Sequence, residues 1–254
     1  MTEALGILGV GHLASYVVAG LRKAGDNRTI RLSPRNRETS EALRQTHGCE
    51  IAPDNQAVAD ECRVILLAVR PQHLDALLDT LTLRDDHLLI SCVAGVSLDA
   101  IRQRVGPARV VRTLPLACAE VGEGVVPLFP DEATARELLS PLGRLIAFDA
   151  ERAFELASMA ACVNGWTYAF LDRLSEWFAG QGLSPEQARE LVVHSIRGAT
   201  GLAAGFPERS LRGISDSIAT PGTYTRDGLD ALEARDAFGA WEDACQLIKD
   251  SLDS

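Results

Sequence analysis

The chain has 254 residues, of which 46% are hydrophobic and 24% charged, and its formal net charge is −10. This composition is that of a globular protein with one or two domains, and the negative charge argues against nucleic acid or an anionic membrane as the main partner. The longest uncharged apolar stretch, residues 156–171, is shorter than the about 18 to 20 residues that a membrane span needs.

The first residues contain Glu3 and an apolar run interrupted by glycine, without the basic segment of a signal peptide. The six cysteines show neither CxxC spacing nor a paired histidine cluster. Reduced and mostly buried thiols are therefore expected in place of disulfides or a zinc site. Together these features predict a cytoplasmic protein without a zinc site.

Up to about residue 148, short apolar runs alternate with amphipathic segments. The runs are residues 4–8, 29–32, 64–69, 88–92 and 110–112. Alternation of strands with helices predicts an α/β domain over residues 1–150, built as a Rossmann-like, doubly wound parallel sheet.

A glycine-rich turn follows the first run and precedes a helix expected at 13–23. Its residues Gly9, Gly11 and Ala14 have the G-x-G-x-x-A spacing of a dinucleotide site, with His12 and Leu13 between them. Gly9 permits the tight turn, Gly11 lets backbone N–H groups approach a pyrophosphate, and Ala14 allows close helix packing. The spacing alone is common, and its place between a strand and a helix makes a cofactor site the favoured interpretation.

The segment after the second run indicates which dinucleotide is bound. An NAD site usually has a carboxylate here for the ribose 2′-hydroxyl, whereas this segment has none before Glu38. Ser33, Arg35 and Arg37 offer hydroxyl and guanidinium donors to a 2′-phosphate, and Asn36 is a further candidate cofactor residue. NADPH is therefore favoured over NADH, with a solvated basic loop as the alternative. Further cofactor contacts are expected at other strand ends, namely Asn55, Ala68, Val69, Arg70, Pro71, Ala94 and Gly95.

Beyond residue 150 the strand patterns stop, so residues 151–254 are expected to form an all-helical domain. Residues 154–179 are apolar on most faces, which indicates burial on all sides. Ser184 and Gln187 predict a capping box at the start of the next helix, and a last helix is expected at about 227–252. About 100 helical residues with so much apolar surface favour a homodimer built through this half; coverage by the sheet domain is the alternative.

Motifs in order along the whole chain carry a family resemblance. They are LGVGHLA at 8–14, AVRPQ at 68–72, ISCVAGV at 90–96, VVRTLPLACAEVGEG at 110–124, GWTYAF at 165–170, HSIRG at 194–198, and the segment 217–232. Together they resemble the pyrroline-5-carboxylate reductase family. The resemblance implies a Rossmann-like domain followed by a helical dimerisation domain. It also implies an NAD(P)H-dependent oxidoreductase that acts on a CH–NH group and reduces a cyclic imine, 1-pyrroline-5-carboxylate, to proline.

The resemblance also implies a catalytic residue. Ser195 matches the threonine of the family's QTxxG motif and keeps its hydroxyl. A hydroxyl donor beside the imine nitrogen would assist protonation while the carbon accepts hydride. The alternative is a helix serine bonded to a neighbouring carbonyl.

The departures from the family fall on the substrate side. Leu116 and Cys118 replace an asparagine and a proline, and Trp166 replaces another proline. The loop 220–225, which in the family holds the substrate carboxylate, has lost one glycine and gained Tyr224. The candidate substrate-binding residues are Asn164, Trp166, Thr220, Gly222, Thr223, Tyr224 and Thr225.

These departures leave other functions open. Trp166 and Tyr224 suit a larger or aromatic imine, or else they pack at the dimer interface. A non-catalytic NADP-binding regulatory paralogue is a further alternative. A β-hydroxyacid dehydrogenase is disfavoured, because the only lysines are Lys23 and Lys249, and neither lies in the first long helix of the second half.

Overall fold

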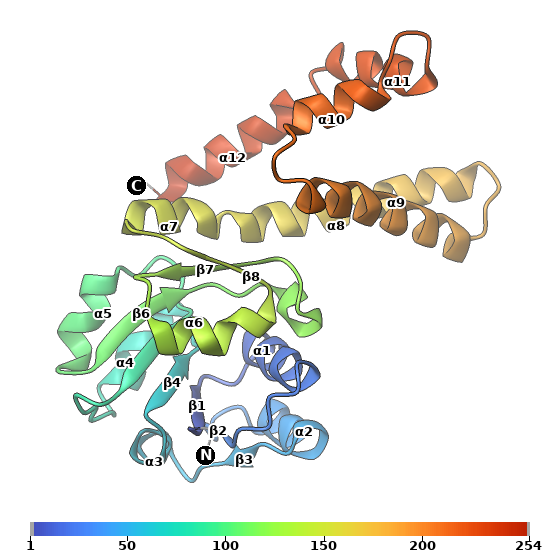
Figure 1. Ribbon diagram of the computed structural model, residues 1–254. Coiled ribbons are helices and arrows are strands. Elements are labelled where there is room, and N and C mark those ends of the chain that lie inside the picture. The colour runs from blue at the N-terminus through green and yellow to red at the C-terminus, as the bar shows by residue number, and fades with distance from the viewer. Residues whose placement is uncertain (1–2, 253–254) are drawn as a thin grey trace. The chain divides into compact units, whose positions relative to one another are not determined.

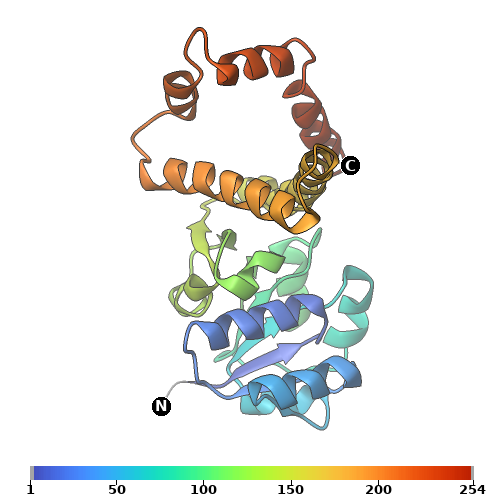
Figure 2. The ribbon, with the colours of Figure 1, turned by 90° about the vertical axis from the view of Figure 1, so that its right-hand side faces the viewer.

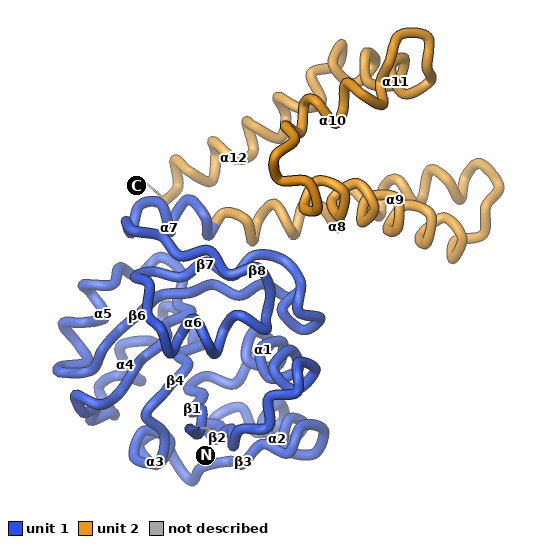
Figure 3. The backbone as a smooth tube through the Cα atoms, in the orientation of Figure 1, with its two compact units in different colours: residues 1–158 blue, residues 159–254 orange. Residues whose placement is uncertain are grey.

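The computed structural model describes residues 3–252, and the chain divides into two compact units, residues 1–158 and 159–254 (Figure 3). The division expected from the sequence was at residue 150. The segment between the two positions is helix α7 (Glu151–Ser158), which contacts strand β7 (Val125–Phe129) of the first unit. The change from strands to helices thus comes before the boundary between the compact units.

Unit 1 contains an eight-stranded sheet in the order β3-β2-β1-β4-β5-β6-β7-β8. Its other strands are β1 (Leu5–Leu8), β2 (Ile30–Leu32), β3 (Glu50–Ile51), β4 (Val64–Leu67), β5 (Leu88–Ser91), β6 (Arg109–Thr113) and β8 (Arg144–Ala147). All neighbouring pairs in the described sheet are parallel except β6 and β7. The strand order runs outward from β1 in both directions, which confirms the predicted doubly wound α/β fold.

Helices cover both faces of this sheet (Figures 1 and 2). One buried cluster contains residues of α1 (His12–Lys23), α2 (Arg37–His47) and α6 (Ala133–Leu139), with the 3₁₀ turns η2 (Ala117–Val121) and η3 (Ser140–Leu142). The other contains residues of α3 (Asn55–Glu61), α4 (Leu74–Leu78) and α5 (Leu98–Val105). Strand β4 contributes Leu66 to the first cluster and Ile65 to the second. Because central strands are buried on both faces, they are apolar throughout, which made them visible in the sequence.

The five predicted strands are all present, with ends within two residues of the expected positions. The sequence reading missed β3, β7 and β8. Strand β3 has two residues, and β7 contains Pro127, a residue that argues against an internal strand. Strand β8 lies at the sheet edge and is half-buried, with Ile146 exposed, so it lacks the continuous apolar run of the central strands.

Gly20 allows α1 to pack against the backbone of η2. A Cβ atom at Gly20 would lie 2.8 Å from Leu142 Cδ2 and closer still to the carbonyl oxygen of Ala119. We expect Gly20→Ala to lower the free energy of unfolding by about 3 kcal/mol, because a rigid carbonyl must shift to admit the methyl group. Urea denaturation followed by circular dichroism at fixed protein concentration measures this loss. A change below about 1 kcal/mol would mean that η2 moves away at little cost.

Helix α7 is fastened to the sheet by Arg112 of β6. The Arg112 side chain is 2% exposed, and its Nη1 donates to Glu151 Oε1 at 2.6 Å and also to Glu155. Its guanidinium carbon lies 4.8 Å from the ring centroid of Phe154. Glu151 Oε1 also accepts the backbone N–H of Leu98 at the start of α5. These contacts explain why α7 belongs to unit 1.

Unit 2 is helical throughout its regular structure, as predicted. Its helices are α8 (Ala160–Gly180), α9 (Pro185–Gly205), α10 (Leu211–Ile218), α11 (Tyr224–Glu233) and α12 (Gly239–Leu252). Helices α8 and α9 form an antiparallel pair (Figure 1). The capping box is confirmed, because Ser184 Oγ accepts the N–H of Gln187 and the Gln187 side chain accepts the N–H of Ser184.

Two helix predictions in this half were wrong. The single apolar helix expected at 154–179 is divided at Met159 into α7 and α8. The last helix expected at 227–252 is divided into α11 and α12 by residues 234–238, where Asp236 has a φ of 51°. Local sequence periodicity did not indicate either interruption.

The expected burial of the apolar helix on all sides does not occur within one chain. No residue of α8 is fully buried, and Phe170 and Trp177 of α8 are 41% and 57% exposed. Large apolar side chains are also exposed on α9 to α12, among them Leu202, Leu211 and Leu247. Within residues 3–252, no helix combines the length and apolar character required to cross a membrane.

Candidate functional site

The glycine turn between β1 and α1 requires glycine at position 9. Gly9 has a φ of +92°, and a Cβ atom there would lie 2.6 Å from Val69 Cγ1 and 2.7 Å from the backbone carbonyl of Ala68. Its N–H donates to Ser33 Oγ at 3.1 Å. The turn is therefore held between the segments that follow β4 and β2.

Gly11 serves a different purpose at the first position before α1. Its φ of −117° is accessible to any residue, and a Cβ atom there would meet no atom within 4 Å. The space in front of the α1 N-terminus is thus open, and the helix directs free N–H groups and positive potential into it. This open cradle fits the pyrophosphate of a dinucleotide.

Two adjoining cavities, of about 520 and 380 Å³, lie beside the turn and share Gly11, Asn36, Ala68, Val69 and Arg70 in their walls. The larger is also lined by His12, Leu13, Thr39, Pro71, Cys92 and Ala94. The smaller is also lined by Gly9, Val10, Arg35 and His73. They form one cleft at the carboxyl ends of β1, β2, β4 and β5, where an open α/β sheet binds its ligands.

Eleven of the fifteen residues proposed for the cofactor line this cleft, and Ala14, Ser33, Asn55 and Gly95 do not. Ala14 is fully buried in the first turn of α1, as close packing of that helix requires. The Ser33 side chain is 2% exposed and engaged with Gly9, so the expectation that it faces a 2′-phosphate is corrected. Asn55 begins α3, and Gly95 follows Ala94 outside the lining.

The sequence analysis missed four residues of the lining, Val10, Thr39, His73 and Cys92. Thr39 is bonded through its hydroxyl to Asn36 Nδ2, which also donates to Val10 O at 2.8 Å. Asn36 therefore ties the loop after β2 to the glycine turn. His73 lies one residue beyond the quoted AVRPQ motif, so a longer motif window would have included it.

Cys92 contributes an uncharged side chain to the wall of the cleft. Burial raises the pKa of its thiol to about 12, so the thiol stays protonated at neutral pH. The group is therefore neither a charge nor a reactive thiolate at the end of β5.

The cleft is basic although the whole chain is acidic. The lining contains Arg35, Arg70, His12 and His73, and no aspartate or glutamate. A cleft with cationic groups and without carboxylates favours a polyanionic ligand. This charge pattern fits a phosphorylated dinucleotide, with Arg35 and Arg70 as its permanently charged groups.

Ser195, the candidate catalytic residue, lies on an exposed part of α9. Within the described part of the chain, its hydroxyl has no hydrogen-bond partner. Serine and threonine hydroxyls elsewhere on the long helices are engaged: Thr200 donates to the carbonyls of Ile196 and Arg197, and Ser175 donates to that of Leu171. The local alternative considered for Ser195, a bond to a preceding carbonyl, is therefore not observed.

The candidate substrate residues of unit 2 fall into two groups. Asn164 and Trp166 are half-buried on α8, where the Trp166 ring packs edge-to-face on Trp241 of α12 with centroids 6.1 Å apart. Packing within the chain thus accounts for the bulky ring at position 166.

The second group forms the loop before α11, residues Thr220, Gly222, Thr223, Tyr224 and Thr225. Gly222 keeps a φ of +82°, and Thr223 caps α11 by accepting the N–H of Arg226. The Tyr224 side chain is 95% exposed in the single chain. The backbone turn therefore forms despite the missing glycine, and the added ring does not fold back over it.

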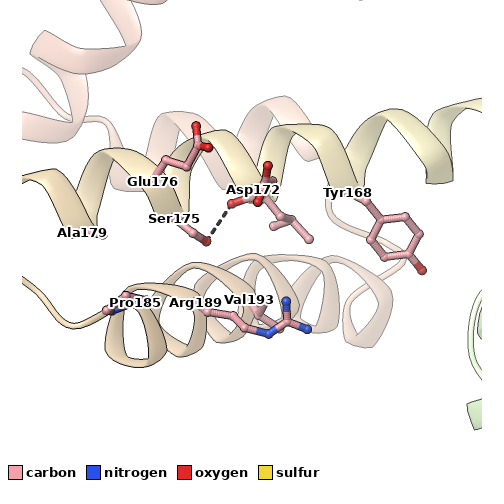
Figure 4. Close-up of a pocket in the computed structure, with 9 residues that line it drawn as sticks. Tyr168, Asp172, Ser175, Glu176, Ala179, Pro185, Arg189 and Val193 are labelled. Carbon is pink, nitrogen blue, oxygen red and sulfur yellow. Dashed lines mark hydrogen bonds between the residues drawn. The ribbon is translucent and has the colours of Figure 1, made fainter.

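A groove of about 730 Å³ lies between α8 and α9 (Figure 4). Tyr168, Asp172, Ser175 and Glu176 come from α8, and Pro185, Arg189 and Val193 come from α9; Leu171 and Ala179 complete the lining. None of the candidate catalytic or substrate residues lines it. The groove is part of the exposed apolar surface of this unit.

Two protein-family models match separate parts of the chain. Residues 4–95 match the family described as NADP oxidoreductase coenzyme F420-dependent. Residues 152–251 match the family described as pyrroline-5-carboxylate reductase dimerisation. The two matches cover the cofactor cleft and the helical half, respectively.

Curated relatives match over nearly the full length. A pyrroline-5-carboxylate reductase from Synechocystis is 27% identical, over 92% of this chain and 91% of the relative. One from Haemophilus influenzae is 25% identical, over 95% and 93%.

Solved structures share the fold. A 1-pyrroline-5-carboxylate reductase from Streptococcus pyogenes superimposes with a TM-score of 0.86 at 22% identity, covering 98% of both chains. The NADP-bound pyrroline carboxylate reductase from Plasmodium falciparum gives 0.83 at 20% identity, covering 99% and 97%. A reductive aminase from Aspergillus terreus gives 0.62 at 16% identity, covering 88% and 81%.

Proposed function

Because this chain belongs to the pyrroline-5-carboxylate reductase family, we propose that it reduces 1-pyrroline-5-carboxylate to proline with NADPH. The observation that carries the proposal is the open cradle at Gly11, set in a cleft without carboxylates, in a chain that matches these reductases nearly end to end. Reduction of the C=N bond is the reaction named for the curated relatives.

In this proposal the cleft of unit 1 binds the dinucleotide. The N–H groups at the start of α1 would hold the pyrophosphate in the open space at Gly11, and Arg35 would contact the 2′-phosphate. His12, Leu13, Ala68, Val69, Pro71 and Ala94 form the remaining contacts. When bound, NADPH supplies the hydride that the imine carbon accepts.

Ser195 is proposed as the proton donor to the imine. A protonated C=N bond accepts hydride more readily, and an uncommitted hydroxyl can hydrogen-bond to the nitrogen and relay a proton from solvent to it, so that the serine hydroxyl is restored. The turn at Gly222 and the α11 N-terminus, with N–H groups suited to a carboxylate, would hold the substrate carboxylate.

We further propose a homodimer formed through unit 2. Exposed apolar side chains occur on all five of its helices, as at Trp177, Leu202, Leu211, Leu232 and Leu247. A surface with this much apolar character is normally covered by another chain. The matched dimerisation family supports a second copy as the cover.

A different imine is the second candidate substrate. The replacements at Leu116, Cys118 and Tyr224 favour it, because they alter positions that the resemblance places on the substrate side. The packing of Trp166 on Trp241 removes one of the original arguments for an aromatic substrate. Pyrroline-5-carboxylate therefore remains the first candidate substrate.

The test is the initial rate of NADPH oxidation by the purified full chain with 1-pyrroline-5-carboxylate, beside cyclic imines that lack the carboxylate or carry an aromatic ring. We expect turnover of pyrroline-5-carboxylate at about 1 to 10³ s⁻¹. Turnover of another imine alone would make the altered positions specificity determinants. NADPH binding without any turnover would favour a regulatory paralogue.

A further inference from the structure

One end of the cofactor cleft contains three basic side chains from two separate segments. Arg35 comes from the loop after β2, whereas Arg70 and His73 come from the segment after β4. All three line the same cavity of about 380 Å³, together with Gly9, Gly11 and Asn36 of the glycine-turn region. Two chain segments that are far apart in the sequence therefore contribute basic groups to this one cavity.

These basic groups are not neutralised by the protein. Within residues 3–252, none of the side chains of Arg35, Arg70 and His73 takes part in an ion pair. The carboxylate nearest to His73 along the chain, that of Asp75, is paired with Arg104 at 2.5 Å. An acidic protein thus leaves three basic side chains unpaired around one cavity, which favours an anionic ligand.

The backbone holds His73 in place. The 3₁₀ turn η1 (Pro71–His73) begins with proline, and the N–H of His73 donates to Arg70 O at 2.9 Å. The next residue, Leu74, is 5% exposed in the core. The backbone of the half-buried residue His73 is therefore held between a hydrogen-bonded turn and the buried side chain of Leu74.

We propose that His73 is a further cofactor-binding residue which, together with Arg35, contacts the 2′-phosphate that distinguishes NADPH from NADH. This inference rests on the proposed function and deepens it. An imidazole N–H can donate to a phosphate oxygen, and a protonated imidazole adds a charge. Arg35 supplies donors from the loop after β2, and His73 supplies a further donor from the segment after β4.

The experiment measures binding without catalysis. Isothermal titration of the full chain compares adenosine 2′,5′-bisphosphate with adenosine 5′-monophosphate, which lacks the 2′-phosphate. We expect His73→Ala to weaken binding of the bisphosphate by about 3- to 10-fold and that of the monophosphate by less than about twofold, as loss of one charge-assisted hydrogen bond predicts. His73→Lys should restore most of the bisphosphate affinity.

Two further variants serve as controls. His47→Ala removes a histidine outside the cleft, at the far end of α2, and should change neither affinity. Arg35→Ala should weaken binding of the bisphosphate selectively. Circular dichroism establishes that each variant is folded.

The outcomes separate this inference from the proposed function. Equal weakening of both nucleotides by His73→Ala would mean that the ring contacts the adenine, and no weakening would remove His73 from the site; either result overturns the inference. If Arg35→Ala is selective in that case, the NADPH proposal stands. A wild-type chain that binds neither the nucleotides nor NADPH would overturn both.

Discussion

NADPH binding is expected to weaken by about 100-fold when Gly11 is replaced by alanine, equivalent to about 2.7 kcal/mol. A Cβ atom at this position meets no protein atom within 4 Å, so it would project into the space proposed for the pyrophosphate. The methyl group would hold the phosphates away from the N–H groups at the start of α1. Titration of NADPH fluorescence measures the dissociation constant.

The same substitution should have little effect on folding. The φ of Gly11 is −117°, so alanine introduces no backbone strain, and a change at this capping position costs less than about 1 kcal/mol. Gly20→Ala, at the other end of α1, is the matched control, because it is expected to lower stability and leave the cradle intact. Tryptophan fluorescence does not serve for unit 1, since Trp166, Trp177 and Trp241 all lie in unit 2.

An unchanged NADPH affinity in Gly11→Ala would place the pyrophosphate elsewhere. A large loss of stability in this variant would instead mean that the space at Gly11 is needed by the protein. The informative result is therefore that Gly11→Ala weakens NADPH binding without lowering stability, whereas Gly20→Ala lowers stability without weakening NADPH binding.

Ser195→Ala is expected to lower kcat by about 100-fold and to leave the dissociation constant of NADPH unchanged. The lost hydroxyl is the proposed proton donor to the imine, and it has no hydrogen-bond partner within residues 3–252 whose loss would affect folding. Steady-state kinetics, with the imine that the turnover assay identifies as substrate, measure the change in kcat. Titration with NADPH measures the dissociation constant separately.

Two substitutions on α9 sharpen this test. Ser195→Thr keeps the hydroxyl and gives the residue expected from the family motif, so it should retain most of the activity. Thr200→Ala removes a hydroxyl that is bonded to the carbonyls of Ile196 and Arg197 and should leave kcat within about twofold. Wild-type kcat in Ser195→Ala would exclude Ser195 from proton transfer.

Local patterns in the sequence were sufficient to predict the central strands, the glycine turn and the capping box at Ser184. Each depends on residues close together in the chain: a run such as Val64–Leu67 is apolar because both of its faces are buried. The helix interruption at Met159 and the break before α12 were not predicted from the sequence; at Met159 the apolar residues continue without a proline or glycine to mark the interruption.

The tertiary structure decided which side chains remain available for a ligand. Ser33 and Arg35 are two residues apart, and both were expected to contact the 2′-phosphate. The Ser33 hydroxyl, however, accepts the N–H of Gly9, 24 positions earlier, whereas Arg35 lines the cleft. His73 reaches the same cavity from the end of another strand. The sequence by itself determined the layered fold and the cofactor turn, because short-range patterning encodes these. Only the packing of distant segments determined which polar groups bond to the protein and which stay free, because a hydrogen-bond partner is set by proximity in space.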